Sequence, residues 1–247
     1  MYDVRCTMNH PACLHRVSQH RTSNIVHPTS NIIHRTSYIV HPSMRKLKIT
    51  EMGRMNVEEF RASEKMPLIV VLDDVRSMYN VGSVFRTADA FRVEAIYLCG
   101  ITAQPPHPEI HKTALGAEDT VAWQHFPTAL DAVNTLKQQG YTVFSIEQCE
   151  GSTLLNELEI RNEELGVHNN PKPSTLNPKP STVNCQLSTV NSKYALILGN
   201  EVKGVHQEVV DASDGCIEIP QFGTKHSLNV STTAGIVIWE FAKRLLI

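Results

Sequence analysis

From Pro67 to the end of the chain, hydrophobic and polar positions follow two alternating patterns. Short apolar runs rich in β-branched residues predict strands at 68–72, 94–99, 141–146, 194–198 and 215–219. Helical periodicity between these runs predicts helices at 81–91, 127–139, 204–212 and 229–246. Strands that alternate with helices are typical of an α/β fold with a parallel sheet and helices on both faces. Such a sheet binds ligands in the loops beyond the carboxyl ends of its strands.

The last predicted helix begins with an unusual polar stretch, HSLNVSTT at residues 226–233. The first turn of a helix leaves N–H groups unpaired, and Ser, Asn or Thr side chains can accept hydrogen bonds from them. One or two polar residues suffice for a cap, whereas this stretch has five around a lone Leu228. Two interpretations stay open on these residues alone: helix capping, and a loop that forms hydrogen bonds with a ligand.

Two tracts repeat with a period of seven, HRTSNIV and its variants at residues 20–43 and NPKPSTL and its variants at 170–191. Their proline and β-branched residues disfavour a coiled coil. A metal site at the spaced histidines of the first tract is also disfavoured, because nothing fixes their geometry. We interpret both tracts as low-complexity, disordered segments. Met44 follows the first tract and is a candidate start.

Composition limits the classes of function. The 247 residues are 41% hydrophobic, enough for one domain with a substantial core, and no apolar run is long enough to span a membrane. Six scattered cysteines argue against a zinc site or a disulfide framework, so we expect no metal and a cytoplasmic location. The net charge of −2 gives no global attraction to nucleic acid, so any RNA contact needs a local basic patch.

Two common nucleotide-binding loops are absent from this sequence. No two glycines are separated by a single residue, which argues against a dinucleotide-binding loop. GNEVKG at residues 199–204 has the glycine spacing of a phosphate loop, but Val205 and His206 replace the required Lys and Ser or Thr. The sequence therefore does not predict a nucleoside triphosphatase.

The loop and helix after the first strand read DDVRSMYNVGSVFRTADAF at residues 73–91. Asn80 stands where a helix N-cap is expected, and Gly82 permits a close backbone approach. Arg86 falls at the edge of the apolar face of this helix. It is either a structural residue that extends its charged head into water or the group that binds an anion in a cleft.

Three segments, in order, resemble the motifs of the TrmH (SpoU) family of RNA ribose 2′-O-methyltransferases in the SPOUT superfamily. The first motif matches Asn80, Gly82, Arg86, Thr87 and Ala88, and the second matches Leu198, Gly199, Glu201 and Gly204. The third motif matches a longer set: Ile219, Pro220, Gly223, Ser227, Leu228, Asn229, Val230 and Ser231. The resemblance extends from about Met44 to Ile247.

The resemblance implies a C-terminal trefoil knot, a homodimer, and S-adenosyl-L-methionine as the cofactor. It assigns catalysis to Arg86, helped by Asn80. We add Glu201, which we expect to orient Arg86 or Asn229. We also add Ser227 and Asn229, which we expect to position the ribose or the cofactor. The cofactor-binding positions that the resemblance implies are Leu198, Gly199, Gly204, Ile219, Pro220, Ser227, Leu228 and Val230. Because a guanidinium is a poor base, we expect Arg86 to hold the adjacent phosphate and stabilise the developing alkoxide. His226 is an alternative base, although a solvated loop histidine is the simpler interpretation.

The expected reaction is therefore 2′-O-methylation of a ribose in structured RNA, with tRNA favoured and rRNA as the alternative. Two further hypotheses are an RNA-binding protein of this fold without catalysis and a related enzyme that methylates a base. We divide the chain into a repeat tract at 1–43, a basic preamble at 44–66, and a methyltransferase domain at 67–247 that carries an insertion at 170–191. The preamble supplies the cations expected to contact RNA phosphates: Arg45, Lys46, Lys48, Arg54 and Arg61. Apolar residues almost all round the helix at 229–246 also favour a dimer.

Overall fold

All five predicted strands are present in the computed structural model, which describes residues 45–161, 186–188 and 192–247. The chain divides into two compact units, residues 1–51 and 52–247. The first repeat tract and residues 170–185 and 189–191 of the second lie outside the described residues. In the first unit, a short 3₁₀ helix, η1 (Ile49–Glu51), follows Arg45, whose guanidinium donates hydrogen bonds of 2.9 and 3.0 Å to Glu51.

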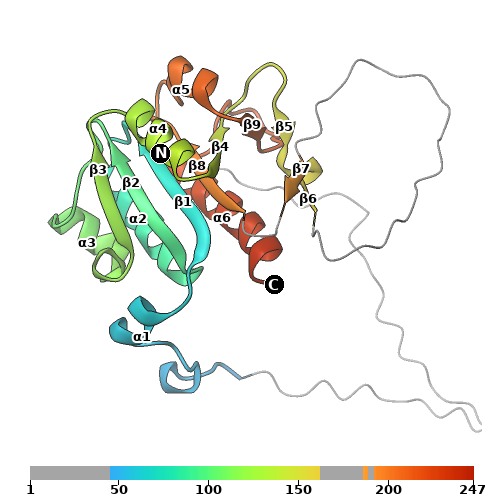
Figure 1. Cartoon of the computed structure of the whole chain (residues 1–247). Coiled ribbons are helices and arrows are strands. Elements are labelled where there is room, and N and C mark those ends of the chain that lie inside the picture. Colours follow the sequence, from blue (N-terminus) through green and yellow to red (C-terminus); the bar gives the residue numbers. More distant parts are fainter. Residues whose placement is uncertain (1–44, 162–185, 189–191) are drawn as a thin grey trace, which may run out of the picture. The chain divides into compact units, whose positions relative to one another are not determined.

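The second unit contains the α/β fold (Figure 1). Its strands are β1 (Met66–Asp73), β2 (Val93–Cys99), β3 (Ala122–Phe126), β4 (Tyr141–Ile146), β5 (Thr153–Leu154), β6 (Glu159–Arg161), β7 (Gln186–Ser188), β8 (Lys193–Leu198) and β9 (Gly215–Glu218). Its helices are α1 (Val57–Ala62), α2 (Met78–Ala90), α3 (Pro108–Ala114), α4 (Ala129–Gln138), α5 (Gln207–Ala212) and α6 (Val230–Leu245), with 3₁₀ helices η2 (Ala117–Asp119) and η3 (Leu155–Glu157).

Seven of these strands form one sheet in the order β3-β2-β1-β8-β4-β9-β5, and every described pair in it is parallel. The chain runs from β1 outward to β2 and β3 and then crosses to β4 on the other side of β8. β8, the central partner of β1 and β4, comes late in the sequence. The carboxyl ends of β8, β4 and β9 therefore lie side by side, although long segments separate them along the chain.

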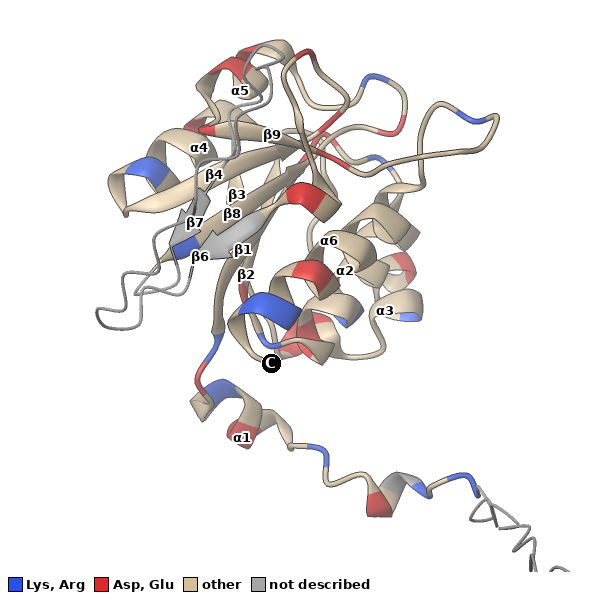
Figure 2. Ribbon diagram, turned by 90° about the vertical axis from the view of Figure 1, so that its right-hand side faces the viewer, with Lys and Arg blue, Asp and Glu red and all other residues tan. Residues whose placement is uncertain are grey.

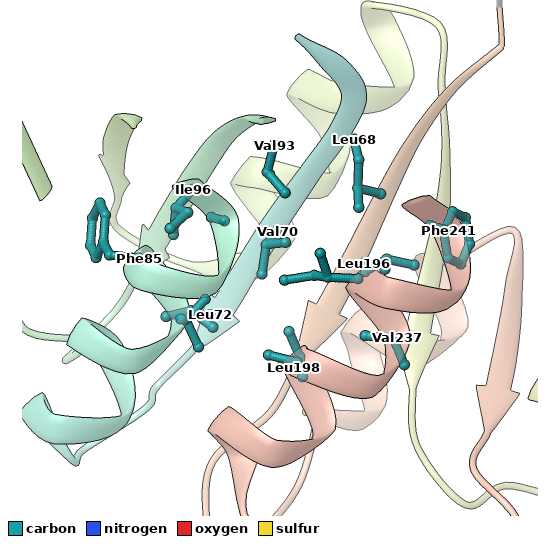
Figure 3. Close-up of a cluster of buried hydrophobic side chains, with 14 of the residues drawn as sticks. Leu68, Val70, Leu72, Phe85, Val93, Ile96, Leu196, Leu198, Val237 and Phe241 are labelled. Atoms are coloured by element: carbon teal, nitrogen blue, oxygen red, sulfur yellow. The ribbon is translucent and has the colours of Figure 1, made fainter. Parts of the chain in front are cut away.

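Helices cover both faces of the sheet, as the alternating pattern predicts. On β1, Leu68, Val70 and Leu72 are buried in the same cluster as side chains of α2 and α6, including Phe85 and Phe241 (Figure 3). The intervening residues Ile69 and Val71 point to the opposite face and pack with side chains of α4 and α5. Because both faces are buried, these strands are continuously apolar, which made them visible in the sequence.

The structure also contains elements that the sequence analysis missed. β3 is an edge strand whose residues are only partly buried, so its sequence, AWQHF, carries no strong apolar signal. α3 packs against α2 but is only seven residues long. Within the predicted insertion, Gln186–Ser188 is described as β7 and pairs in parallel with β6. This part of the insertion is thus ordered strand.

The basic preamble is divided between the two units. α1 begins with a capping box in which Asn56 and Glu59 satisfy each other's backbone N–H groups. Phe60 on α1 is buried in the core of the second unit, and Arg61 donates a hydrogen bond of 2.7 Å to the carbonyl of Asp119. Among the described residues, no helix has both the length and the apolar content that a membrane crossing requires.

Candidate functional site

A pocket of about 310 Å³ opens at the carboxyl ends of β4, β8 and β9. This is the edge where a parallel sheet of this kind is expected to bind a ligand. Its lining comes from the ends of those strands, the loops that follow them, and the first turn of α6. The lining residues are Ile146–Gln148, Leu198–Gly204, Ile217–Ile219, Gln221, His226–Leu228, Val230 and Thr233.

Most of the predicted cofactor positions lie in this pocket. Leu198, Gly199, Gly204, Ile219, Ser227, Leu228 and Val230 all line it. Pro220 does not, although its neighbours Ile219 and Gln221 do. Among the residues predicted for catalysis, Glu201 and Ser227 line the pocket.

Two glycines shape the loop after β8. Asn200 and Gly204 exchange backbone hydrogen bonds of 3.0 and 2.9 Å, which fold the loop back on itself. A Cβ atom on Gly199 would lie 2.0 Å from the carbonyl carbon of Gly204 and 2.1 Å from the nitrogen of Val205. Gly204 has a φ of +70°, and its own Cβ would lie 2.1 Å from Glu147 Oε2. At Gly199 the backbone itself occupies the space that a side chain needs, whereas at Gly204 the positive φ and the Glu147 carboxylate together favour glycine.

Glu201 connects this loop to the start of α2. Its carboxylate accepts hydrogen bonds of 3.0 Å from the backbone N–H groups of both Arg76 and Ser77, and one of 3.1 Å from Asn80 Nδ2. Burial acts to raise the pKa of the Glu201 carboxyl, but these hydrogen bonds outweigh it, so the pKa lies below its ordinary value. Glu201 is therefore a carboxylate at neutral pH and is held in place by three donors.

Asn80 extends the connection to the start of α6. Its Oδ1 accepts a hydrogen bond of 3.1 Å from Asn229 Nδ2, while its Nδ2 donates to Glu201. The interpretation of Asn80 as a helix N-cap was wrong: Ser77 is the N-cap of α2, and Asn80 lies inside the helix, only 8% exposed. One buried amide thus ties together the three predicted motifs.

The structure shows the capping function that the polar stretch before α6 left open, while its role in binding a ligand stays a prediction. Asn229 is the N-cap of α6, and its Oδ1 accepts from the backbone N–H groups of Ser231 and Thr232. Its Nδ2 is left free to bind Asn80. Ser227 is exposed and lines the pocket, so it is available to a ligand.

Arg86 lies apart from this cluster. It is exposed on α2, does not line the pocket, and makes no hydrogen bond or ion pair within the described part of the chain. It follows Asn80 by six residues, which places it about 120° away around the helix and about 9 Å along it. A single chain therefore does not bring Arg86 and Asn80 onto the same face.

The predicted RNA-binding cations are distributed over both units. Arg45, Lys46 and Lys48 belong to the first unit, and Arg45 is paired with Glu51. Arg54 and Arg61 belong to the second unit, where Arg61 also binds the carbonyl of Asp119. These five residues stay a prediction as an RNA contact.

Several pocket residues were not recognised in the sequence. Glu147 accepts a hydrogen bond of 3.1 Å from the backbone N–H of Val205, so it positions the loop after β8. Glu218 accepts one of 2.9 Å from the hydroxyl of Ser152. Gln148 donates one of 3.3 Å to the carbonyl of His226. Their position in the sequence could have identified them, because all three residues stand at or just after the carboxyl end of a predicted strand.

A second polar cluster lies outside the pocket. Asp73, Asp74 and His206 have potential ligand atoms within 4.8 Å of one another, the one such group among the described residues. The Asp73 carboxylate accepts hydrogen bonds of 3.1 and 2.9 Å from the backbone N–H and the Nδ1 of His206. These contacts join the end of β1 to the start of α5, which accounts for the cluster as a structural connection.

A protein family and several known proteins resemble this chain in sequence. The model of the SpoU rRNA methylase family matches residues 67–239. A Borreliella burgdorferi protein named as an uncharacterised tRNA/rRNA methyltransferase is 27% identical over 189 residues, which are 76% of this chain and 69% of the relative. The tRNA (guanosine(18)-2′-O)-methyltransferase of Thermus thermophilus is 26% identical over 197 residues, 80% of this chain and 85% of the relative.

Solved structures also share the fold of this chain. The AdoMet-bound rRNA methyltransferase of Sinorhizobium meliloti superimposes with a TM-score of 0.57 at 23% identity. The superposition covers 76% of this chain and 61% of that one, so this chain spans about three fifths of its length. The family model covers more than half of the chain and all three motifs. The chain therefore belongs to the SpoU rRNA methylase family.

Proposed function

We propose that this protein transfers a methyl group from S-adenosyl-L-methionine to the 2′-hydroxyl of a ribose in structured RNA. The observation that supports the proposal is the pocket at the carboxyl ends of β4, β8 and β9, which is lined by residues of the family's second and third motifs. Asn80, from the first motif, forms hydrogen bonds with Glu201 of the second motif and Asn229 of the third. S-adenosyl-L-methionine, when bound, supplies an electrophilic methyl group on a positively charged sulfur.

The volume and the charge of the pocket suit this cofactor. Its volume of about 310 Å³ falls in the range of pockets for small ligands. Gly199 and Gly204 support the pocket by letting the loop after β8 fold back on itself, because a Cβ on either would meet neighbouring protein atoms. The lining contains three glutamates, Glu147, Glu201 and Glu218, but one lysine, Lys203. This excess of negative charge favours a positively charged ligand. We propose that Leu198, Ile219, Pro220, Leu228 and Val230 complete the binding site.

The remaining motif residues have roles in positioning and charge stabilisation. We propose that Asn80, held by Glu201 and Asn229, fixes the relative positions of the cofactor loops and α2. Ser227 is exposed at the pocket and would bind the ribose or the cofactor. Arg86 would hold the phosphate next to the target ribose and stabilise the developing alkoxide, with proton removal assisted by that phosphate.

A homodimer would explain why apolar side chains and Arg86 are exposed on α6 and α2. Ile236 and Trp239 on α6 and Leu246 at its C-terminal end are exposed at 36, 46 and 39%, and Tyr79 on α2 is exposed at 46%. Apolar residues in such a stripe favour a protein partner. We propose that a second copy covers this face and that Arg86, which lies on the exposed side of α2, acts on RNA bound across both copies. Sedimentation that shows a folded, active monomer at micromolar concentration would contradict this proposal.

We also propose the trefoil knot that the family resemblance implies. The segment between β9 and α6 supports it, because this segment passes from the far side of β4 to α6, which packs on β1, β8 and α2. On the way it binds Gln148 from the loop after β4 and Asn80 from α2. A cytoplasmic location is part of the same proposal, as RNA substrates would be met there.

Methylation assays on two RNA fractions test the function. The full chain and S-adenosyl-L-methionine with a labelled methyl group are incubated separately with tRNA and rRNA from a strain that lacks this gene. Digestion to nucleosides should show the label on a 2′-O-methylribose, and mapping these sites in the deletion strain should identify the missing one. We expect tRNA to be the substrate, as for the Thermus thermophilus relative by its name, with rRNA as the alternative.

Two results would support the other hypotheses. RNA binding without methyl transfer would indicate an RNA-binding protein that has this fold but no activity. A label on a base in place of a ribose would indicate a related base methyltransferase. The presence of both Asn80 and Arg86 argues against each of them.

A further inference from the structure

An aromatic side chain stands free in solvent beside the proposed cofactor pocket. Phe222 is 97% exposed, more than any other large hydrophobic residue among those described. Its neighbour Gln221 lines the pocket, as do His226 and Ser227 further along the same loop. A fully exposed phenyl ring contributes nothing to the core, so folding does not explain its position.

Two unpaired cations accompany this ring. Lys225 lies three residues after Phe222, and Lys203 lies in the loop after β8 that lines the same pocket. Both side chains are exposed, and neither ammonium has a hydrogen bond or an ion pair within the described residues. Figure 2 shows blue segments on the loops that project above α6, with red segments on the same loops. Lys203 and Lys225 are thus a local pair of cations on loops around a pocket that Glu147, Glu201 and Glu218 also line, and a local contact is what the net charge of −2 requires of nucleic-acid binding.

A free aromatic ring with nearby cations is the combination that binds single-stranded nucleic acid. Bases stack on aromatic faces, and lysines contact the phosphates between them. Neither group alone identifies RNA, because an exposed ring also suits a protein partner and lysines are common on surfaces. Their presence together on the loops that line the pocket favours RNA.

We propose that Phe222 is a stacking platform for an unpaired base next to the methylated ribose, with Lys203 and Lys225 bound to the adjoining phosphates. This rests on the proposed RNA methylation and adds how the substrate is held. It implies a substrate whose target lies in a loop or other unpaired segment, because a base inside a duplex cannot reach the ring. Phe222 is then a positioning residue for RNA and contacts neither the cofactor nor the reacting atoms.

The test measures RNA affinity as a function of salt in the full chain. The probes are the tRNA and rRNA fractions from the deletion strain, and the variants are Phe222→Leu, Phe222→Tyr and Lys225→Gln. Loss of stacking should raise the Kd of Phe222→Leu about 5- to 150-fold, the equivalent of about 1–3 kcal/mol. The slope of log affinity against log salt concentration should not change, since no charge is removed. Phe222→Tyr should keep the affinity of the unaltered chain.

Lys225→Gln should change the salt dependence of binding, which Phe222→Leu should leave unchanged. Removing one phosphate contact should reduce the magnitude of the salt slope by about 0.7–0.9. Leu115→Ala serves as the control, because Leu115 is 63% exposed at the end of α3, does not line the pocket, and should affect neither quantity.

Three results would overturn the inference. Unchanged RNA affinity in Phe222→Leu would show that no base stacks on the ring. Weaker cofactor binding in Phe222→Leu, measured by calorimetry without RNA, would show that the ring covers the cofactor. A change in sedimentation of Phe222→Leu would show that it contacts a second copy. If the unaltered chain methylates RNA in each case, the proposed function survives and only the stacking role fails.

Discussion

Replacing Gly199 by alanine tests the loop that we assign to the cofactor. The added Cβ would meet Gly204 C at 2.0 Å, Val205 N at 2.1 Å and Gly204 O at 2.4 Å, whereas ordinary contact begins at 3.4 Å. The backbone must therefore move by about 1 Å or more, because every atom in the way is main chain. No side-chain rotation can relieve the contact.

The size of the effect follows from what this movement disrupts. The two backbone hydrogen bonds between Asn200 and Gly204, at 3.0 and 2.9 Å, and the bond of 3.1 Å from Val205 N to Glu147 hold the loop in its present shape. Overpacking costs about 1–3 kcal/mol, and each lost hydrogen bond costs about 1 kcal/mol. If the movement breaks one of these three hydrogen bonds, we expect a loss of about 2–4 kcal/mol, divided between the stability of the domain and its affinity for the cofactor.

Calorimetric titration with S-adenosyl-L-methionine and thermal unfolding together measure this loss. We expect at least a tenfold weaker Kd, about 1.4 kcal/mol, and the remainder as a Tm lowered by about 2–4 °C per kcal/mol. Gly235→Ala is the matched control, because nothing lies within 4 Å of its Cβ position inside α6. It should raise the Tm slightly, since alanine is favoured over glycine in a helix. Normal cofactor affinity together with a normal Tm in Gly199→Ala would refute our reasoning about this loop.

Three further predictions concern other parts of the molecule. Arg86→Ala should abolish methyl transfer and leave cofactor affinity unchanged, because Arg86 lies outside the pocket; substantial turnover in the RNA assay would contradict its catalytic role. The pKa of Glu201 is lower in the folded chain than in the unfolded one, so its carboxylate stabilises the fold above about pH 4.3 and this contribution is lost as the pH falls. The difference in unfolding free energy between the unaltered chain and Glu201→Gln should therefore stay nearly constant from pH 6 to about pH 4.3 and shrink as the pH falls further, and a difference that stays constant below about pH 4.3 would argue against this contribution. Deleting residues 170–185, which leaves β7 (Gln186–Ser188) in place, should preserve methyl transfer and lower the Tm by less than about 8 °C, or about 2 kcal/mol; a larger loss would mean that the repeats are packed.

The sequence by itself determined the class of fold. The apolar runs at 68–72, 94–99, 141–146, 194–198 and 215–219 are strands of the sheet, and the helices lie on both of its faces. This information is local, because a strand buried on both faces must be apolar along its whole length. β3 escaped detection for the same reason: at the edge of the sheet four of its five residues are exposed or half-buried, and its pattern is weak.

The motifs in the sequence also located the loops that we assign to the cofactor, but only the tertiary structure decided how they meet. Asn80 looks like a helix cap in its local sequence, yet it binds Glu201 and Asn229, which follow it by 121 and 149 residues. Glu147 positions a loop 58 residues away, and no periodicity marks such a contact. Hydrophobic patterning reflects how each segment is buried, which depends on its own residues. A site built at the ends of several strands depends on the order of those strands in the sheet, which the folded chain alone determines.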